Sequence, residues 1–292
     1  VQNDPRFSGA DGQYYNFDFL KSMPKEKWPQ AFKEERLKTA VRHLGVPAEK
    51  ITFIDHHTAH AYYAYFAAPI DRSRKTAVVT ADGFGDDCNA SISVAQGKTI
   101  KEIHRTSMCN LARLYRWMTL LLGMRPNEHE YKVMGLAPYA KDYIKQPAYK
   151  IFKENLVVDG IDFKWNERPK DMYFHYKERF ERAGVRFDGI AGGLQQYVEE
   201  LVTEWIANIL TELGADSLVY SGGLTMNVKI NKAIAEMPQV REFFVAPSGS
   251  DESVCMGAAF AACYQKDTIQ PLQHAYLGPS VQEDEVAAAL KE

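Results

Sequence analysis

Residues 217–264, SLVYSGGLTMNVKINKAIAEMPQVREFFVAPSGSDESVCMGAAFAACY, decide the fold class of this protein. Ser217 to Tyr220 and Phe243 to Ala246 have the length and apolar composition of buried strands. Met226 to Glu236 and Asp251 to Tyr264 have the length and spacing of helices. Strands that alternate with helices in this way are typical of an α/β fold.

Three more strands are predicted upstream of this stretch, at Thr76 to Thr80, Ala90 to Val94 and Thr99 to Arg105. A turn at residues 95–98 (Ala-Gln-Gly-Lys) joins the last two. With the later strand–helix units they predict a mixed sheet covered by helices.

The remaining segments are less uniform. Helical spacing predicts helices at about 31–44, 58–66, 111–122 and 190–213. We expect a loop over the first thirty residues and a short strand from Ile51 to Ile54. Residues 139–188 are aromatic and charged without a clear period, and they are a candidate wall for a bound sugar, because sugars stack on aromatic faces.

Composition excludes several classes of protein. The 292 residues contain 35 Lys plus Arg and 38 Asp plus Glu, so the net charge of −3 argues against binding nucleic acid or anionic membranes through bulk charge. No apolar run approaches the roughly 18–20 residues of a spanning helix, and the amino end lacks the order of a signal peptide. The four cysteines form no Cys-x-x-Cys pair. We therefore expect a cytoplasmic protein with no nucleic-acid or membrane partner.

Two histidines with helical spacing are the sharpest local signal. His56 and His60 lie at i and i+4, which places both imidazoles on one face of a helix. A carboxylate is needed to complete a metal-binding face, and either Asp82 or Asp251 offers one. Two histidines with a carboxylate suit Fe(II), although zinc or manganese also fits this donor set.

Two glycine-containing loops predict phosphate binding. Residues 221–224 (Ser-Gly-Gly-Leu) follow a strand and precede a helix, where glycines admit a phosphate and amides face it. Residues 82–86 (Asp-Gly-Phe-Gly-Asp) form a second loop with carboxylates able to hold a cation–phosphate complex. The candidate nucleotide-binding residues are Gly83, Gly85, Lys132, Ser221, Gly222, Gly223, Asn227 and Asn231, with Lys229 as a further donor.

Five ordered segments resemble the O-carbamoyltransferases, the family of the nodulation-factor and antibiotic carbamoyltransferases. They are DHHTAHA (55–61), DGFGD (82–86), EYKVMGLAPYA (130–140), SGGLTMNVKIN (221–231) and SDESVCMGAA (250–259). The resemblance covers roughly residues 33 to 290. It implies an actin-like nucleotide-binding fold of two lobes, with mixed sheets flanked by helices.

The resemblance also implies a reaction. Carbamoyl-adenylate is made from carbamoyl phosphate and ATP, and its carbamoyl group passes to a hydroxyl of a small-molecule or sugar acceptor. The metal, Fe(II) or another divalent ion, is held by the residues matching His56, His60, Asp82 and Asp251 and grips the phosphate of the adenylate. The candidates for the base that takes the hydroxyl proton are His57, Asp86 and a metal-bound group, and nothing in the sequence chooses among them.

The chain departs from the family pattern in three respects. The amino-terminal strand pair of the first lobe is missing, and Ser253 stands where glycine is expected. The adenylate-forming domain, a partner normally in the same chain, is absent after Glu292. We therefore predict the remainder of an incomplete first lobe over 1–75, a second lobe over 76–292, and a homodimer as one candidate assembly.

Three other functions stay open at this stage. A sugar-kinase-like phosphotransferase has the same fold but needs no histidine pair. A tRNA threonylcarbamoyl-transfer protein needs tRNA binding, which the charge disfavours. A non-catalytic nucleotide-binding fragment is the third alternative.

Overall fold

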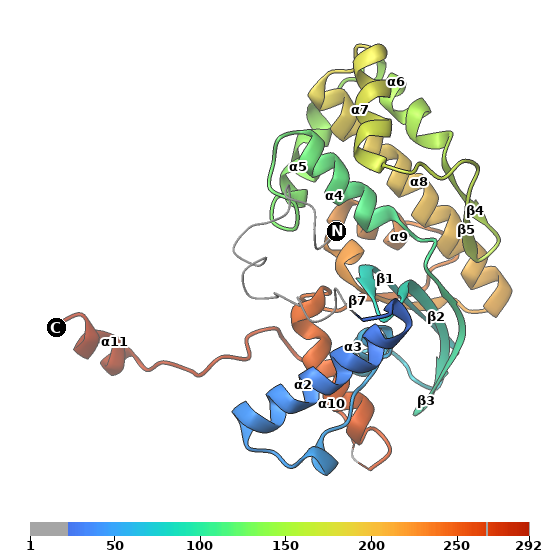
Figure 1. Cartoon of the computed structure of the whole chain (residues 1–292). Helices are drawn as coiled ribbons and strands as arrows, with labels where there is room; N and C mark the ends of the chain where they lie inside the picture. The colour runs from blue at the N-terminus through green and yellow to red at the C-terminus, as the bar shows by residue number, and fades with distance from the viewer. Residues whose placement is uncertain (1–22, 267, 292) are drawn as a thin grey trace. The chain divides into compact units, whose positions relative to one another are not determined.

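A five-stranded sheet lies at the centre of the computed structural model, which describes residues 23–266 and 268–291 (Figure 1). The strand order is β3-β2-β1-β6-β7. β1, β2 and β3 are antiparallel neighbours, whereas β6 and β7 run parallel to β1. The bounds are Thr76–Gly85 (β1), Cys88–Gln96 (β2), Thr99–Thr106 (β3), Ser217–Ser221 (β6) and Glu242–Val245 (β7). The α/β fold with a mixed sheet flanked by helices is confirmed.

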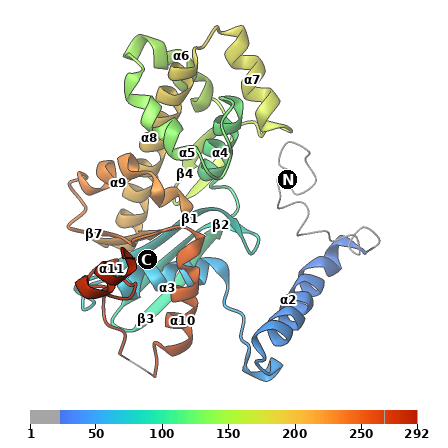
Figure 2. The ribbon, with the colours of Figure 1, turned by 90° about the vertical axis from the view of Figure 1, so that its left-hand side faces the viewer.

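Both faces of β1 are buried, which explains its continuous apolar sequence. Ala77, Val79 and Ala81 belong to the larger apolar core, which also includes residues of α4 (Leu111–Leu121) and α8 (Phe187–Leu213). Val78 belongs instead to a second cluster, with residues of α3 (His56–Ala67). Figure 2 shows α3 and α10 (Val254–Cys263) on one side of the sheet and α8 and α9 (Val228–Ala235) on the other.

The predicted elements are confirmed apart from the Ile51 to Ile54 strand. Those four residues form no strand, since their backbone pairs with no other segment among the described residues. The aromatic segment 139–188 folds into helices and a hairpin. The additional elements are η5 (Ala137–Tyr139), α5 (Glu130–Leu136), α6 (Asp142–Lys153), β4 (Leu156–Asp159), β5 (Asp162–Trp165), α7 (Met172–Arg182), η6 (Gly223–Met226), η7 (Asp251–Ser253) and α11 (Glu283–Ala289).

The described residues up to Phe53 form a compact unit separate from the one that starts at Ile54. The first unit contains η3 (Lys25–Lys27), α2 (Trp28–Leu44) and η4 (Ala48–Lys50). α2 ends at Gly45, whose φ of 65° provides the left-handed cap that favours glycine. The loop predicted over the first thirty residues falls mainly on 1–22, outside the described residues, and it is wrong for residues 25–30, which belong to η3 and α2. The predicted lobe boundary between 75 and 76 stays a prediction, and α3 lies in the unit of the sheet.

Within the described part of the chain, no helix combines the length and the apolar character needed to cross a membrane.

Candidate metal centre

The histidine pair is carried by the first turns of α3. Asp55 caps this helix, because its carboxylate accepts hydrogen bonds from the Thr58 amide at 2.8 Å and the Thr58 hydroxyl at 3.0 Å. Arg105 of β3 holds Asp55 in turn, with two bonds of 2.8 and 2.7 Å. The helical spacing brings Nε2 of His56 and Nε2 of His60 to 3.2 Å from each other. No motif in the sequence pointed to Arg105.

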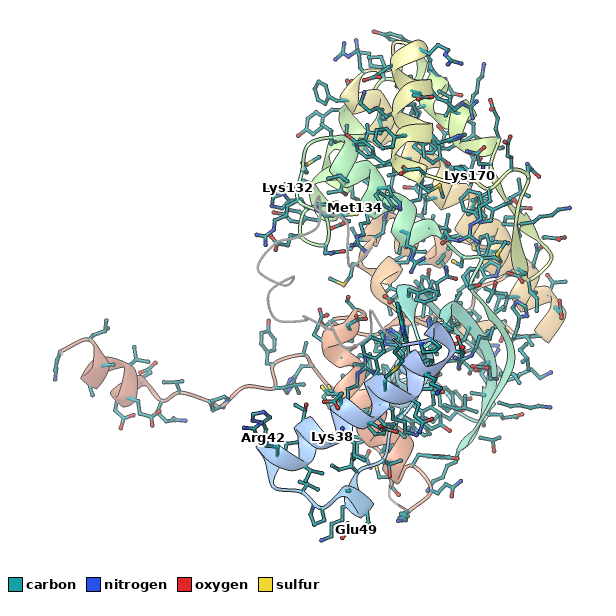
Figure 3. All side chains as sticks on the ribbon, in the orientation of Figure 1. Lys38, Arg42, Glu49, Lys132, Met134 and Lys170 are labelled. Atoms are coloured by element: carbon teal, nitrogen blue, oxygen red, sulfur yellow. The ribbon has the colours of Figure 1, made fainter. Side chains whose placement is uncertain are left out.

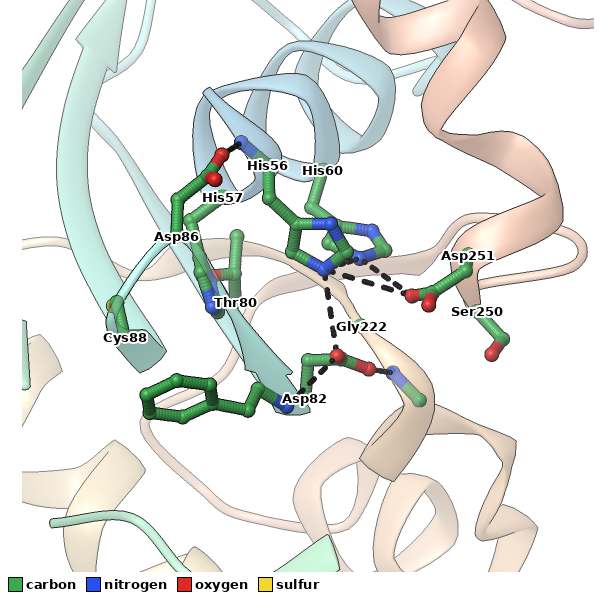
Figure 4. Close-up of polar contacts among 12 residues, drawn as sticks. His56, His57, His60, Thr80, Asp82, Asp86, Cys88, Gly222, Ser250 and Asp251 are labelled. Atoms are coloured by element: carbon green, nitrogen blue, oxygen red, sulfur yellow. Dashed lines mark hydrogen bonds and ion pairs between the residues drawn. The ribbon is translucent and has the colours of Figure 1, made fainter. Parts of the chain in front are cut away.

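Two carboxylates from different parts of the sheet meet the histidines (Figure 4). Asp82 lies near the end of β1, and its Oδ2 is 3.4 Å from Nε2 of His56. Asp251 follows the loop after β7, and its Oδ1 is 3.5 Å from Nε2 of both His56 and His60. One ligand atom from each residue lies within 4.8 Å of all the others. We call His56, His60, Asp82 and Asp251 the His–Asp cluster.

The spacing of the His–Asp cluster fits one metal ion. Two donors bound at about 2.0–2.2 Å from one ion are about 2.8–3.6 Å apart at tetrahedral or octahedral angles. The four contacts of 3.2 to 3.5 Å fall in this range.

The Ser221 hydroxyl supports the His60 ring from the side opposite Asp251. Its oxygen is 3.3 Å from Nδ1 of His60, and the hydroxyl donates to the Gly249 carbonyl at 3.3 Å. Nε2 of His60, on the other edge of the ring, faces the Asp251 carboxylate.

The cluster is buried on one side and open on the other. The side chains of His60 and Asp82 are buried, whereas the Asp251 side chain is 65% exposed. Burial alone raises the pKa of Asp82, but hydrogen bonds from His56 and the Gly223 amide outweigh it and hold the pKa below its ordinary value. Asp82 therefore stays ionised, and a ligand can approach from the side of Asp251.

His57 lies beside the cluster but faces the sheet. Its Nδ1 is 2.7 Å from the Thr80 hydroxyl, which is 2.7 Å from the Ser91 hydroxyl. Its Nε2 is buried without a hydrogen-bond partner among the described residues. Burial, with the neighbouring His56 and His60, lowers the pKa of His57 to about 4. The ring is therefore neutral at pH 7, and its role as a base stays a prediction.

The second predicted phosphate loop is the end of β1 and a tight turn. Asp86 and Asp87 occupy the turn with φ of 47° and 61°. The Asp86 carboxylate accepts a 2.8 Å bond from the His56 amide and so supports the start of α3. Gly85 lies directly against the His56 ring, since a Cβ there would be 2.2 Å from the ring carbon Cδ2. Gly83 faces open space.

The first predicted phosphate loop is packed against β1. Gly222 has a φ of 101°, and a Cβ there would lie 2.3 Å from the Ala81 carbonyl oxygen, so only glycine fits. The Gly222 amide donates to the Gly249 carbonyl at 2.7 Å, and the Gly223 amide donates to Asp82 at 2.7 Å. These amides orient the cluster, and phosphate contact by the loop stays a prediction.

The other predicted nucleotide-binding side chains are held by protein groups or exposed. Asn227 caps α9 and exchanges hydrogen bonds with Gln195. Asn231 donates to the Thr225 carbonyl at 2.7 Å, and its Oδ1 is buried without a partner among the described residues. Lys132 is exposed on α5, with its ammonium 5.7 Å from the centre of the Tyr131 ring (Figure 3).

The chain matches one family model and several curated relatives. The model described as Carbamoyltransferase N-terminus matches residues 19–260. The uncharacterized protein sll1178 of Synechocystis is 26% identical over 94% of this chain and 48% of that protein. The nodulation protein NolNO of Sinorhizobium fredii is 26% identical over 82% of this chain and 35% of that protein. The chain thus spans about half or less of the length of these relatives.

Among solved structures, component A of (R)-2-hydroxyglutaryl-CoA dehydratase from Acidaminococcus fermentans aligns with a TM-score of 0.45 at 16% identity. The alignment covers 72% of this chain and 68% of that chain.

Proposed function

This chain belongs to the Carbamoyltransferase N-terminus family, and on that premise we propose that it transfers a carbamoyl group from carbamoyl-adenylate to a hydroxyl of a small acceptor. The observation that carries the proposal is the His–Asp cluster, whose four ligand atoms converge within 4.8 Å. It lies where the parallel pairing of β1 with β6 ends, at the carboxyl edge of the sheet, where α/β proteins bind their ligands.

His56, His60, Asp82 and Asp251 would hold a divalent metal. Two imidazoles with carboxylates suit Fe(II), and manganese or zinc fits the same donors. When bound, the ion supplies positive charge that stabilises the phosphate of the departing AMP. Ser221 orients His60, and the Gly223 amide orients Asp82, so both ligands are preorganised.

An acceptor hydroxyl must lose a proton when it attacks the carbamoyl carbon. Of the two residues that are candidate bases, Asp86 is exposed and His57 is fully buried, which supports Asp86. The donor would be formed from carbamoyl phosphate and ATP.

Metal analysis and nucleotide titration test the proposal together. We expect about one divalent ion per chain in protein purified without chelators, and none in the His56→Ala/His60→Ala variant. The His274→Ala variant removes an exposed histidine and controls for nonspecific binding. Calorimetry should show AMP binding that depends on the metal. Equal AMP binding by metal-free and metal-loaded protein would contradict the proposed role of the cluster.

A further inference from the structure

An arginine and an aromatic ring lie next to the His–Asp cluster. Arg113 of α4 stacks over Phe84, with its guanidinium carbon 4.3 Å from the ring centre. Phe84 follows Asp82 by two residues, and its amide donates to the Asp82 carboxylate at 3.3 Å. The stack is therefore tied to a metal-binding residue through the backbone of β1.

Stacking occupies the face of the guanidinium and leaves its edge available. The five N–H donors of arginine lie in the plane of the group, where they match a phosphate or carboxylate in a two-point contact. Among residues 23–266 and 268–291, no carboxylate forms an ion pair with Arg113. The Phe84 side of the stack is open, since this residue is 43% exposed.

The charge around the stack is positive. Burial lowers the pKa of Arg113, and the positive charges of Arg116 and Arg168 lower it further, although Asp82 opposes them. A divalent ion would neutralise the two carboxylates of the His–Asp cluster, because two charges of −1 balance +2. Loading the cluster would therefore weaken the attraction of Asp82, which opposes the positive charges that act on Arg113. An anionic ligand would restore a negative charge beside Arg113.

We propose that Arg113, held on Phe84, is an anion-binding subsite for a phosphate or carboxylate group of the ligand that occupies the metal centre. The inference rests on the proposed function and specifies the substrate class of that site. The anionic group has two candidate sources, which are the phosphate of the nucleotide donor and an acidic group on the acceptor.

The test uses metal-loaded protein and two probes. AMP is titrated by calorimetry into the wild type, Arg113→Met and Arg113→Lys. Orthophosphate is then titrated into each protein saturated with AMP. Arg182→Met removes the same charge from an exposed position on α7 and is the matched control. Metal content and thermal melting are measured for every variant, so a folding defect or a lost metal is recognised directly.

The loss of a hydrogen bond to a charged group corresponds to a weakening of roughly 10-fold to 100-fold. If the nucleotide supplies the anion, Arg113→Met weakens AMP binding by that factor, and Arg113→Lys recovers only part because lysine lacks the planar fork. If the acceptor supplies the anion, Arg113→Met leaves AMP binding unchanged and abolishes the binding of orthophosphate to the AMP-saturated protein. Unchanged binding of both probes by metal-loaded Arg113→Met would overturn the subsite and leave the metal centre standing. A wild type without metal would instead overturn the proposed function.

Discussion

Substituting Gly85 with alanine tests the geometry of the metal centre without touching any ligand. The new Cβ would lie 2.2 Å from Cδ2, 2.3 Å from Cγ and 2.8 Å from Nε2 of His56. Carbon atoms in contact are about 3.5 Å apart or more, so the imidazole has to move by at least about 1.3 Å. Metal–ligand distances tolerate about 0.2 Å. We therefore expect His56 to be lost as a ligand.

The expected weakening of metal affinity exceeds the roughly 10-fold to 100-fold that loss of a residue supporting a ligand costs. The Gly85 backbone adds no strain, because it does not have the positive φ that disfavours alanine, so the loss of stability should be limited to the roughly 1–3 kcal/mol that displacing the His56 ring costs. Gly83→Ala is the matched control, since it lies two residues away on β1 with nothing within 4 Å of a new Cβ. Competition titration with a chelator gives the affinities, and thermal melting reports the fold. Wild-type affinity in Gly85→Ala would refute His56 as a ligand in this geometry.

Three further predictions concern the supporting residues and the core. Ser221→Ala should weaken metal binding by about 10-fold or more in the same titration, because His60 loses the hydroxyl that supports its ring. An unchanged affinity would count against that role. At pH 8 an alkylating reagent should modify the exposed Cys255 and spare Cys109, because burial raises the pKa of the Cys109 thiol to about 12 and little thiolate is present. Mass spectrometry of the native and the unfolded protein measures the labelling of each cysteine. Equal labelling of Cys255 and Cys109 in the native protein would contradict the prediction. Leu194→Ala should destabilise the fold by about 2–5 kcal/mol in urea unfolding, since Leu194 of α8 is fully buried in the larger apolar core. A loss below about 1 kcal/mol would refute its place in the core.

Local sequence predicted the elements that depend on near neighbours. The i and i+4 spacing of His56 and His60 fixed their common face, because helical geometry is set within one turn. The strand pattern around Thr76 and Ser217 likewise predicted buried strands. The segment 139–188 was not predicted, since its helices and hairpin are short and their apolar residues are distributed over several elements that pack on α8.

The meeting of distant residues depended on the tertiary structure. From the residues alone, Asp82 and Asp251 were alternatives for the carboxylate beside the histidines. The parallel pairing of β1, β6 and β7 brings the carboxyl ends of these strands to one edge of the sheet, and there both carboxylates face the histidines. The contacts of Gly85 with His56 and of Arg113 with Phe84 have the same origin. Sequence by itself therefore determined the strands of the main sheet, most of the helices around it and the donor types. Only the tertiary structure decided which donors meet, because strand pairing and helix packing join residues that are far apart along the chain.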